Sequence, residues 1–215
     1  MRTRGSGFSF QLGGIAEITK GWRLGFTYDS PTWMSVSEEL LQRIETVRPV
    51  DNVAILYPDI LNIYPDYSFK TPGRLSLSTA YVFGGSSLIS FDYSYKDFSA
   101  MEFTSDNFNL QNQDISDFMT SASTFNVGGE YRIQNTSLRA GYFIQESPYL
   151  NENYLADTTG YSFGLGYNFG NTTLDFSYQR IEQDRQGVLY FTGLSQEAEL
   201  QSFINNYALT LSFNL

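Results

Sequence analysis

Apolar and polar residues alternate along nine segments of the chain, and this period of two restricts the fold more than any other feature. Alternation over at least about four to eight residues predicts β-strands with one apolar face and one polar face. In one segment, for example, Phe91 and Tyr93 alternate with Asp92 and Ser94. The nine predicted strands are 7–18, 21–30, 73–83, 87–97, 123–133, 138–145, 161–169, 174–179 and 207–215.

The connections between these strands alternate between short and long. The short turns are 19–21, 84–86, 134–136 and 170–171, and the long loops are 31–72, 98–122, 147–158 and 181–204. Transmembrane β-barrels have short periplasmic turns and long extracellular loops, whereas a soluble sandwich has no reason to alternate in this way. Aromatic residues make up 17% of the chain, and no apolar run approaches twenty residues. We therefore predict an all-β fold, a transmembrane antiparallel β-barrel in a Gram-negative outer membrane.

The number of predicted strands indicates an incomplete barrel. Single-chain bacterial barrels usually have an even number of strands, and nine is odd. Residues 1–7 run directly into the first strand without the apolar core of a signal peptide. We therefore expect residues 1–215 to be a single C-terminal portion of a longer barrel. Its last strand, with Phe213 and Leu215, is expected to be recognised by the barrel-assembly machinery.

The composition excludes several classes of function. The chain has no cysteine and no histidine, so it lacks the usual zinc ligands and the commonest general base. We expect no metal, no cofactor and no enzymatic activity, although a hydrolase that uses only carboxylates is conceivable. The net charge of −10 argues against a nucleic-acid partner, because phosphate binding needs a basic surface.

The polar face of the strands, which would line the barrel lumen, carries ten charges. They are Glu17, Asp29, Asp92, Glu130 and Asp175, with Arg23, Arg74, Lys96, Arg132 and Arg139. Glu130 and Arg139 flank a short turn and should be cross-strand neighbours. One interpretation is a structural charge network. The other is that an arginine binds a ligand carboxylate, and Arg23, Arg74 and Arg139 are the candidates.

The loop 31–72 contains more apolar residues than a solvent-exposed loop needs. Residues 37–47 have acids near their start and apolar residues at helical spacing, so we predict a short helix there. Its apolar face would comprise Leu40, Leu41, Ile44 and Val47. This surface would either pack on other loops as a lid or form a groove for an apolar ligand.

Four segments together resemble the FadL-like outer-membrane transporters of long-chain fatty acids and other hydrophobic compounds. They are GWRLGFTYDSP (21–31), KTPGRLSLSTAY (70–81), ISFDYSY (89–95) and SLRAGYFIQESP (137–148). The resemblance implies a fourteen-stranded barrel and a loop 31–72 that helps to form an outer hydrophobic groove. It also implies passive uptake of hydrophobic small molecules, with membrane lipid as the other partner. The alternative is a structural or adhesive barrel with a sealed, charged lumen.

Overall fold

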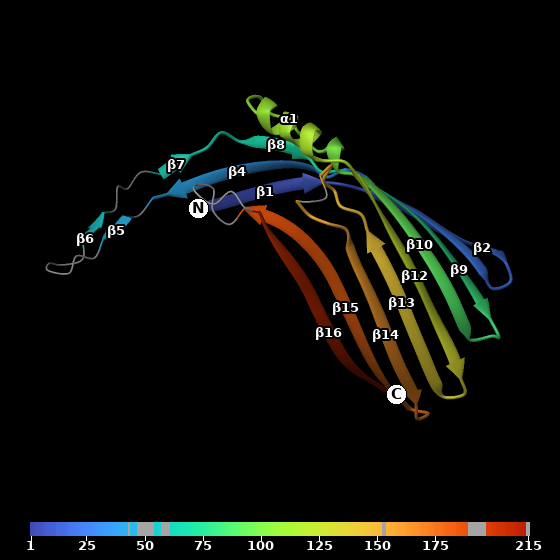
Figure 1. Ribbon diagram of the computed structural model, residues 1–215. Helices are drawn as coiled ribbons and strands as arrows, with labels where there is room; N and C mark the ends of the chain where they lie inside the picture. The colour runs from blue at the N-terminus through green and yellow to red at the C-terminus, as the bar shows by residue number, and fades with distance from the viewer. Residues whose placement is uncertain (43, 47–53, 57–60, 152–153, 189–196, 214–215) are drawn as a thin grey trace.

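The computed structural model describes residues 1–42, 44–46, 54–56, 61–151, 154–188 and 197–213. Its main feature is a curved antiparallel sheet of nine strands (Figure 1). In spatial order these are β16 (Glu197–Phe213), β15 (Thr172–Val188), β14 (Thr158–Asn168), β13 (Thr136–Gln145), β12 (Ser121–Ile133), β10 (Ser87–Asp97), β9 (Arg74–Phe83), β3 (Trp22–Asp29) and β2 (Gln11–Thr19).

The nine-stranded sheet has long loops at one end, and a second sheet lies at that end. Its order is β1 (Arg2–Phe8), β4 (Trp33–Leu41), β8 (Tyr67–Lys70) and β11 (Glu102–Phe103), and β7 (Leu61–Ile63) also pairs with β4. Two further strands, β5 (Ile44–Thr46) and β6 (Ala54–Leu56), pair with each other. The helical elements are the 3-10 turn η1 (Phe98–Ala100) and the helix α1 (Asn109–Phe118).

Within the described residues of the long sheet, the ladder registers confirm the predicted faces of the strands. Directly opposed residues in an antiparallel ladder point to the same side of the sheet. One row of opposed residues runs from Leu24 and Thr79 through Phe91 and Val127 to Tyr142, so these side chains share the apolar face. A row on the other face joins Leu88, Glu130 and Arg139. By the same registers all ten predicted lumen charges lie on that polar face.

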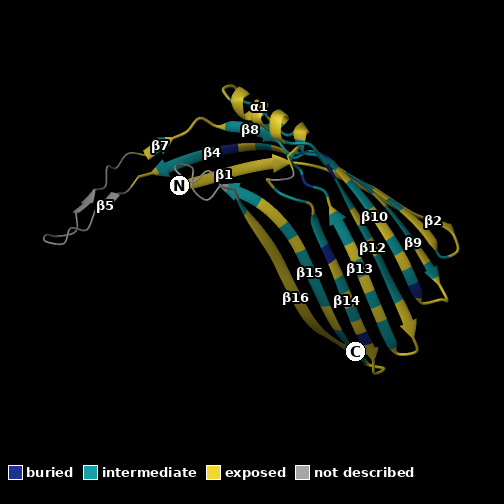
Figure 2. Cartoon of the chain, in the orientation of Figure 1, coloured by how far each residue is buried: buried dark blue, intermediate teal, exposed yellow. Residues whose placement is uncertain are grey.

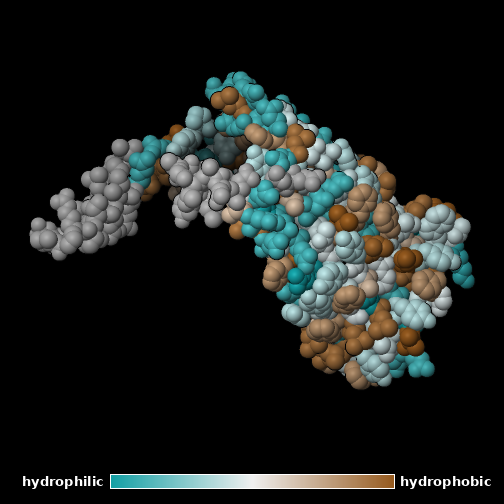
Figure 3. Space-filling model, in the orientation of Figure 1, coloured by the Kyte–Doolittle hydropathy of each residue, from teal (hydrophilic) through white to brown (hydrophobic). Residues whose placement is uncertain are grey.

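Large apolar side chains on the apolar face of the nine-stranded sheet are unusually exposed. Leu209 is 71% exposed and Phe163 57%. So many exposed apolar side chains cannot face water in a stable protein, whereas they are expected on the wall of a barrel in lipid. Figure 3 shows hydrophobic residues gathered over the end of the sheet that carries the short turns. No described helix is long and apolar enough to cross a bilayer.

The long sheet is open along its two edges, as predicted. The ladder runs from β16 to β2, and no described residues join these two strands to each other. Figure 2 shows that both edge strands are exposed along most of their length. The chain therefore forms a curved wall whose edges leave backbone groups unpaired, which lipid does not tolerate.

The second sheet continues several strands of the first beyond a sharp bend. The bend passes through Phe10, Ser30 and Pro31, and then Pro72 and Gly73. Proline lacks an N–H group and therefore interrupts the ladder. The Ser30 amide donates to the Phe10 carbonyl at 2.9 Å, and the Ser30 hydroxyl accepts from the Phe10 amide at 2.9 Å. A Cβ atom at Gly73 would lie 2.9 Å from the Asp29 carbonyl oxygen, so only glycine allows this approach.

The predicted helix at 37–47 is wrong. Residues Trp33–Leu41 form β4, which pairs with β1 along Arg2–Phe8. Ladder pairing outweighs the helical spacing, because β4 extends a hairpin that β2 and β3 have already started. Leu40 and Leu41 are adjacent in a strand and so point to opposite faces, which removes the single apolar face. Ile44 lies in β5, and Val47 falls outside the described residues.

Other elements also differ from the sequence prediction. The first predicted strand, 7–18, is divided between β1 and β2 at the bend. β15 and β16 extend through most of the predicted loop 181–204, up to Val188 and from Glu197. The helix α1 lies in the predicted loop 98–122.

Candidate functional site

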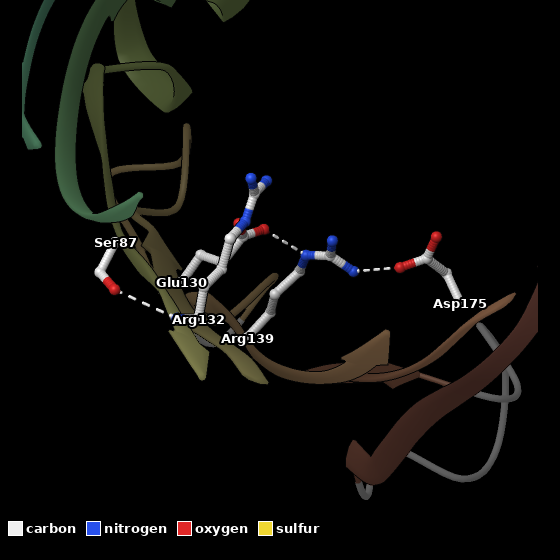
Figure 4. A network of polar contacts seen from close by, with 5 residues as sticks. All are labelled: Ser87, Glu130, Arg132, Arg139 and Asp175. Carbon is white, nitrogen blue, oxygen red and sulfur yellow. Dashed lines mark hydrogen bonds and ion pairs between the residues drawn. The ribbon is translucent and has the colours of Figure 1, made fainter. Parts of the chain in front are cut away.

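A chain of ion pairs crosses the polar face near the short turns (Figure 4). The Arg139 guanidinium donates to Glu130 and to Asp175, in each case at 2.5 Å. Arg132 donates to the same Glu130 carboxylate, and the Arg132 amide donates to the buried Ser87 hydroxyl at 3.1 Å. One arginine on β13 thereby connects β12 to β15 on the concave side of the sheet. Every charge in this group has a partner, so the network stabilises the wall.

Two glycines of β14 make room for the Arg139 side chain. A Cβ atom at Gly164 would lie 3.2 Å from the Arg139 Cβ. At Gly166 it would lie 2.4 Å from the Asp175 Oδ1 and 3.2 Å from an Arg139 terminal nitrogen. The arginine lies across these bare backbone positions to reach the neighbouring strand.

We expect Gly166→Ala to destabilise the folded protein by about 1 kcal/mol, because the new methyl group must displace the Asp175 carboxylate from Arg139. Gly14→Ala is the matched control, because nothing lies within 4 Å of a Cβ atom there. Equilibrium unfolding in lipid vesicles measures both. Equal effects of the two substitutions would contradict this role of Gly166.

A cavity of about 640 Å³ lies at the bend, near the end of the lumen that carries the long loops. Its walls come from strands of the nine-stranded sheet and from the segments that connect this sheet to the second one, and hydroxyl and amide side chains dominate them. The lining includes Ser9, Gln11, Ser30, Thr32, Thr71, Ser94, Thr124 and Gln145, with the rings of Phe10 and Phe98 and the charged residues Asp29, Arg74 and Lys96. The cavity is large enough for part of a small ligand and offers both polar and apolar contacts.

The two cations of this cavity differ in their partners. The Arg74 Nε donates to Asp29 at 2.7 Å, and Gln11 donates to the same carboxylate. Lys96 lies opposite Arg74 in the ladder, and its ammonium group is 4.8 Å from the centre of the Phe98 ring. Within the described part of the chain, Lys96 has no acidic partner. It is therefore a half-buried cation that can bind an anion.

The three predicted arginines do not form one site. Arg74 lies at the bend, whereas Arg23 lies at the opposite end of the wall, beside the turn at Gly21. The charge of Arg139 is already paired with two carboxylates. Arg23 is exposed, and no described acid forms an ion pair with it. Lys96 is the cation that sequence reasoning did not select, although it was assigned to the lumen.

The four predicted apolar contacts are separated from this cavity. Leu41 is 62% exposed at the end of β4, and Leu40 is partly covered. Ile44 is placed only as part of β5, and Val47 is not described. None of the described members lines the cavity at the bend.

A cluster of aromatic side chains holds the second sheet together. The rings of Phe103 and Phe108 stack with their centres 4.7 Å apart, and Tyr67 lies 5.5 Å from Phe108. The Tyr67 hydroxyl donates to Glu38 at 3.2 Å. Burial raises the pKa of Tyr67, and the neighbouring Glu38 carboxylate raises this pKa further. The phenol therefore stays protonated and keeps its hydrogen bond at neutral pH.

The fold is similar to several solved channels. The chain shares 18% identity with the CymD monoaromatic hydrocarbon channel (TM-score 0.54; 97% of this chain, 51% of that chain). It shares 16% identity with a FadL homologue of Pseudomonas aeruginosa (TM-score 0.54; 96% of this chain, 52% of that chain). It also shares 16% identity with the Pseudomonas putida toluene transporter TodX (TM-score 0.50; 97% of this chain, 50% of that chain). The chain thus spans about half the length of these structures, and at this identity the likeness shows the fold alone.

None of the curated proteins matches the chain. A sequence profile does match, over residues 1–214, and its description is "Outer membrane protein transport protein (OMPP1/FadL/TodX)". This match covers nearly the whole chain and agrees with the curved antiparallel wall and its exposed apolar face. The chain therefore belongs to the outer membrane protein transport protein family (OMPP1/FadL/TodX) and is located in the outer membrane.

Proposed function

We propose that the whole protein takes up hydrophobic molecules passively through the outer membrane, and that its ligands include amphipathic carboxylates such as long-chain fatty acids. The family match supports the transport of hydrophobic compounds. Among the similar structures, two are described as channels for monoaromatic hydrocarbons or toluene, which carry no charge. The choice of a carboxylate ligand therefore rests on this chain's own residues.

The observation that carries the carboxylate proposal is the state of Lys96. Four other cations of the lumen face are Arg74, Arg132, Arg139 and Arg23, and the first three have acidic partners. Lys96 faces a cavity near the outer mouth and is half buried, so a charge there lacks full hydration. A carboxylate would compensate that cost with a charge-assisted hydrogen bond.

The rest of the cavity fits the other parts of such a ligand. Its hydroxyl groups can bind the second carboxylate oxygen, and the rings of Phe10 and Phe98 offer apolar contact to the first methylenes. Arg74 is already bonded to Asp29, so we assign it to holding the site in shape. Loop 31–72 is proposed as the outer capture surface, with exposed Leu41 as its described apolar contact.

We expect Lys96→Gln in the full-length protein to raise the Kd for palmitate about tenfold, because one charge-assisted hydrogen bond is lost at a half-buried position. The Kd for hexadecanol, which has the same chain without the charge, should not change. Displacement of a fluorescent fatty acid from protein in nanodiscs measures both. Lys70→Gln is the control, since Lys70 lies outside this cavity and pairs with Glu102 at 3.5 Å. Equal Kd values for palmitate in the wild type and Lys96→Gln would refute the carboxylate site.

The structural alternative is supported by one observation. The network of Glu130, Arg132, Arg139 and Asp175 connects three strands, β12, β13 and β15, and pairs each of these charges with another. A barrel with only this role should give no fatty-acid uptake. Growth on oleate as sole carbon source, in cells whose own transporter is deleted, separates the two functions.

A further inference from the structure

A second cavity, of about 560 Å³, lies among the loops, and its chemistry differs from that of the cavity at the bend. It is lined by Asp114, Ile115, Phe118, Met119, Tyr149, Tyr154, Leu155 and Arg185. Six of these eight residues are apolar or aromatic. Phe118 and Tyr154 are about half exposed, at 46% and 52%. Outside the lipid-facing band, such a group of exposed apolar side chains indicates a binding surface.

The walls of this cavity are fixed by backbone hydrogen bonds between three segments. The Thr120 amide donates to the Pro148 carbonyl at 2.8 Å, and the Leu150 amide donates to the Phe118 carbonyl at 3.0 Å. On the other side, the Ala156 amide donates to the Asp184 carbonyl at 2.8 Å. The cavity is therefore a formed feature that joins α1, the loop before β14 and the upper part of β15.

The aromatic rings are arranged to receive another ring. The Tyr154 ring lies 6.3 Å from that of Phe118 at an interplanar angle of 82°, and 6.2 Å from that of Tyr149 at 60°. Aromatic rings prefer such edge-to-face or offset arrangements, and Met119 adds a polarisable thioether to the same wall. A flat aromatic ligand would find several of these contacts at once.

Arg185 provides a positive charge at the edge of this cavity. Arg185 is exposed, and within the described residues it forms no ion pair. It lies ten residues from Asp175 in the uninterrupted strand β15, so it shares the lumen face and points over the mouth. The planar guanidinium of Arg185 can donate two parallel hydrogen bonds to one carboxylate. Asp114 also lines the cavity and would weaken this attraction, but it is exposed, and water screens it.

We propose that this cavity binds aromatic carboxylates at the mouth of the barrel, with the ring against Phe118 and Tyr154 and the carboxylate on Arg185. The proposal rests on the proposed uptake function and adds to it a second ligand class. The lining of this site comes from loops 98–122 and 147–158 and from β15, and none of the lining residues belongs to loop 31–72. It would collect aromatic acids before they enter the lumen.

Photoaffinity labelling tests this site directly. The full-length protein in nanodiscs is irradiated with an aryl-diazirine benzoate, or with the matching aryl-diazirine benzyl alcohol, and labelled peptides are mapped. We expect the benzoate to label residues 115–119, 149–151 or 154–155. Half-maximal labelling should need about fivefold more benzoate in Arg185→Gln and about half as much in Asp114→Asn. The alcohol should respond to neither change. Phe118→Ala should weaken labelling by both probes.

The outcomes separate this proposal from the proposed function. Absence of benzoate labelling in these segments would overturn the site, and labelling that Arg185→Gln leaves unchanged would overturn the carboxylate class. Palmitate binding is measured on the same preparations. If its dependence on Lys96 persists while the labelling fails, only the second site is refuted. If palmitate binding is also independent of Lys96, the proposed carboxylate function fails separately.

Discussion

Val127→Arg should destabilise the folded protein by about 2–4 kcal/mol, whereas Asn126→Arg, one residue earlier on the same strand, should cost well under 1 kcal/mol. Val127 lies near the middle of β12 on the apolar face, opposite Phe91 and Tyr142. An arginine there would place its charge in the bilayer midplane. Asn126 faces the lumen opposite Asp92, so an arginine at that position gains water and an acid.

The measurement is equilibrium unfolding by guanidinium from lipid vesicles, with both variants compared to the wild type. The pair is well matched because the two substitutions add the same side chain to adjacent residues of one strand. Similar costs for both variants would contradict the assignment of lipid and lumen faces. A larger cost for Asn126→Arg would reverse it.

The faces of the nine strands could be predicted because two different solvents act on them. Lipid selects apolar side chains on one side, and water in the lumen permits polar side chains on the other. Apolar and polar residues therefore alternate along the sequence of each strand. Between the lipid-facing part of the sheet and the long loops, this alternation disappears. In β15 the outward face carries Arg180, which pairs with Glu182 at 2.5 Å. The upper part of this strand was therefore predicted as loop.

The helix prediction at 37–47 failed for a different reason. The spacing of Leu40, Leu41 and Ile44 satisfies a helix, but spacing says nothing about which segment lies alongside. β1 offers seven paired positions to β4, and Val36, opposite Gly5, is among the few buried residues of the chain. Conversely, the sequence of α1 is mostly polar and has no strong apolar periodicity, so it does not predict a helix. The helix accordingly buries no residue, and Leu110 is exposed.

The candidate site was only partly predictable, because pairing decides which cation is available. Arg74 and Lys96 are equivalent in the sequence pattern, since both lie on the lumen face at the long-loop end of their strands. Asp29 lies opposite Arg74 in the ladder and occupies it, while Lys96 has Arg74 and Ala122 as its opposed residues. The register between strands distant in sequence determines this difference. The cavity itself forms where the bends of several strands coincide, and alternation alone does not specify those bends.

Arg139→Gln should destabilise the protein by about 2 kcal/mol. The substitution leaves Asp175 without its cation and Glu130, which is only 12% exposed, with Arg132 alone. This expected cost lies between the value for a buried pair with one partner removed and the small value for a surface pair, because Arg139 is 38% exposed to the lumen. Arg74→Gln, at a 53% exposed side chain with one acidic partner, should cost less than about 1 kcal/mol.

A double-mutant cycle isolates the contribution of the pair. Asp175→Asn in the Arg139→Gln background should restore part of the loss, because no uncompensated carboxylate remains. The palmitate Kd of Arg139→Gln should equal that of the wild type, since the charge of Arg139 is already paired with two carboxylates. A weaker palmitate affinity with little change in unfolding free energy would instead make Arg139 a ligand-binding residue. The combination expected here, lower stability with unchanged affinity, assigns the network to the wall and leaves ligand binding to Lys96.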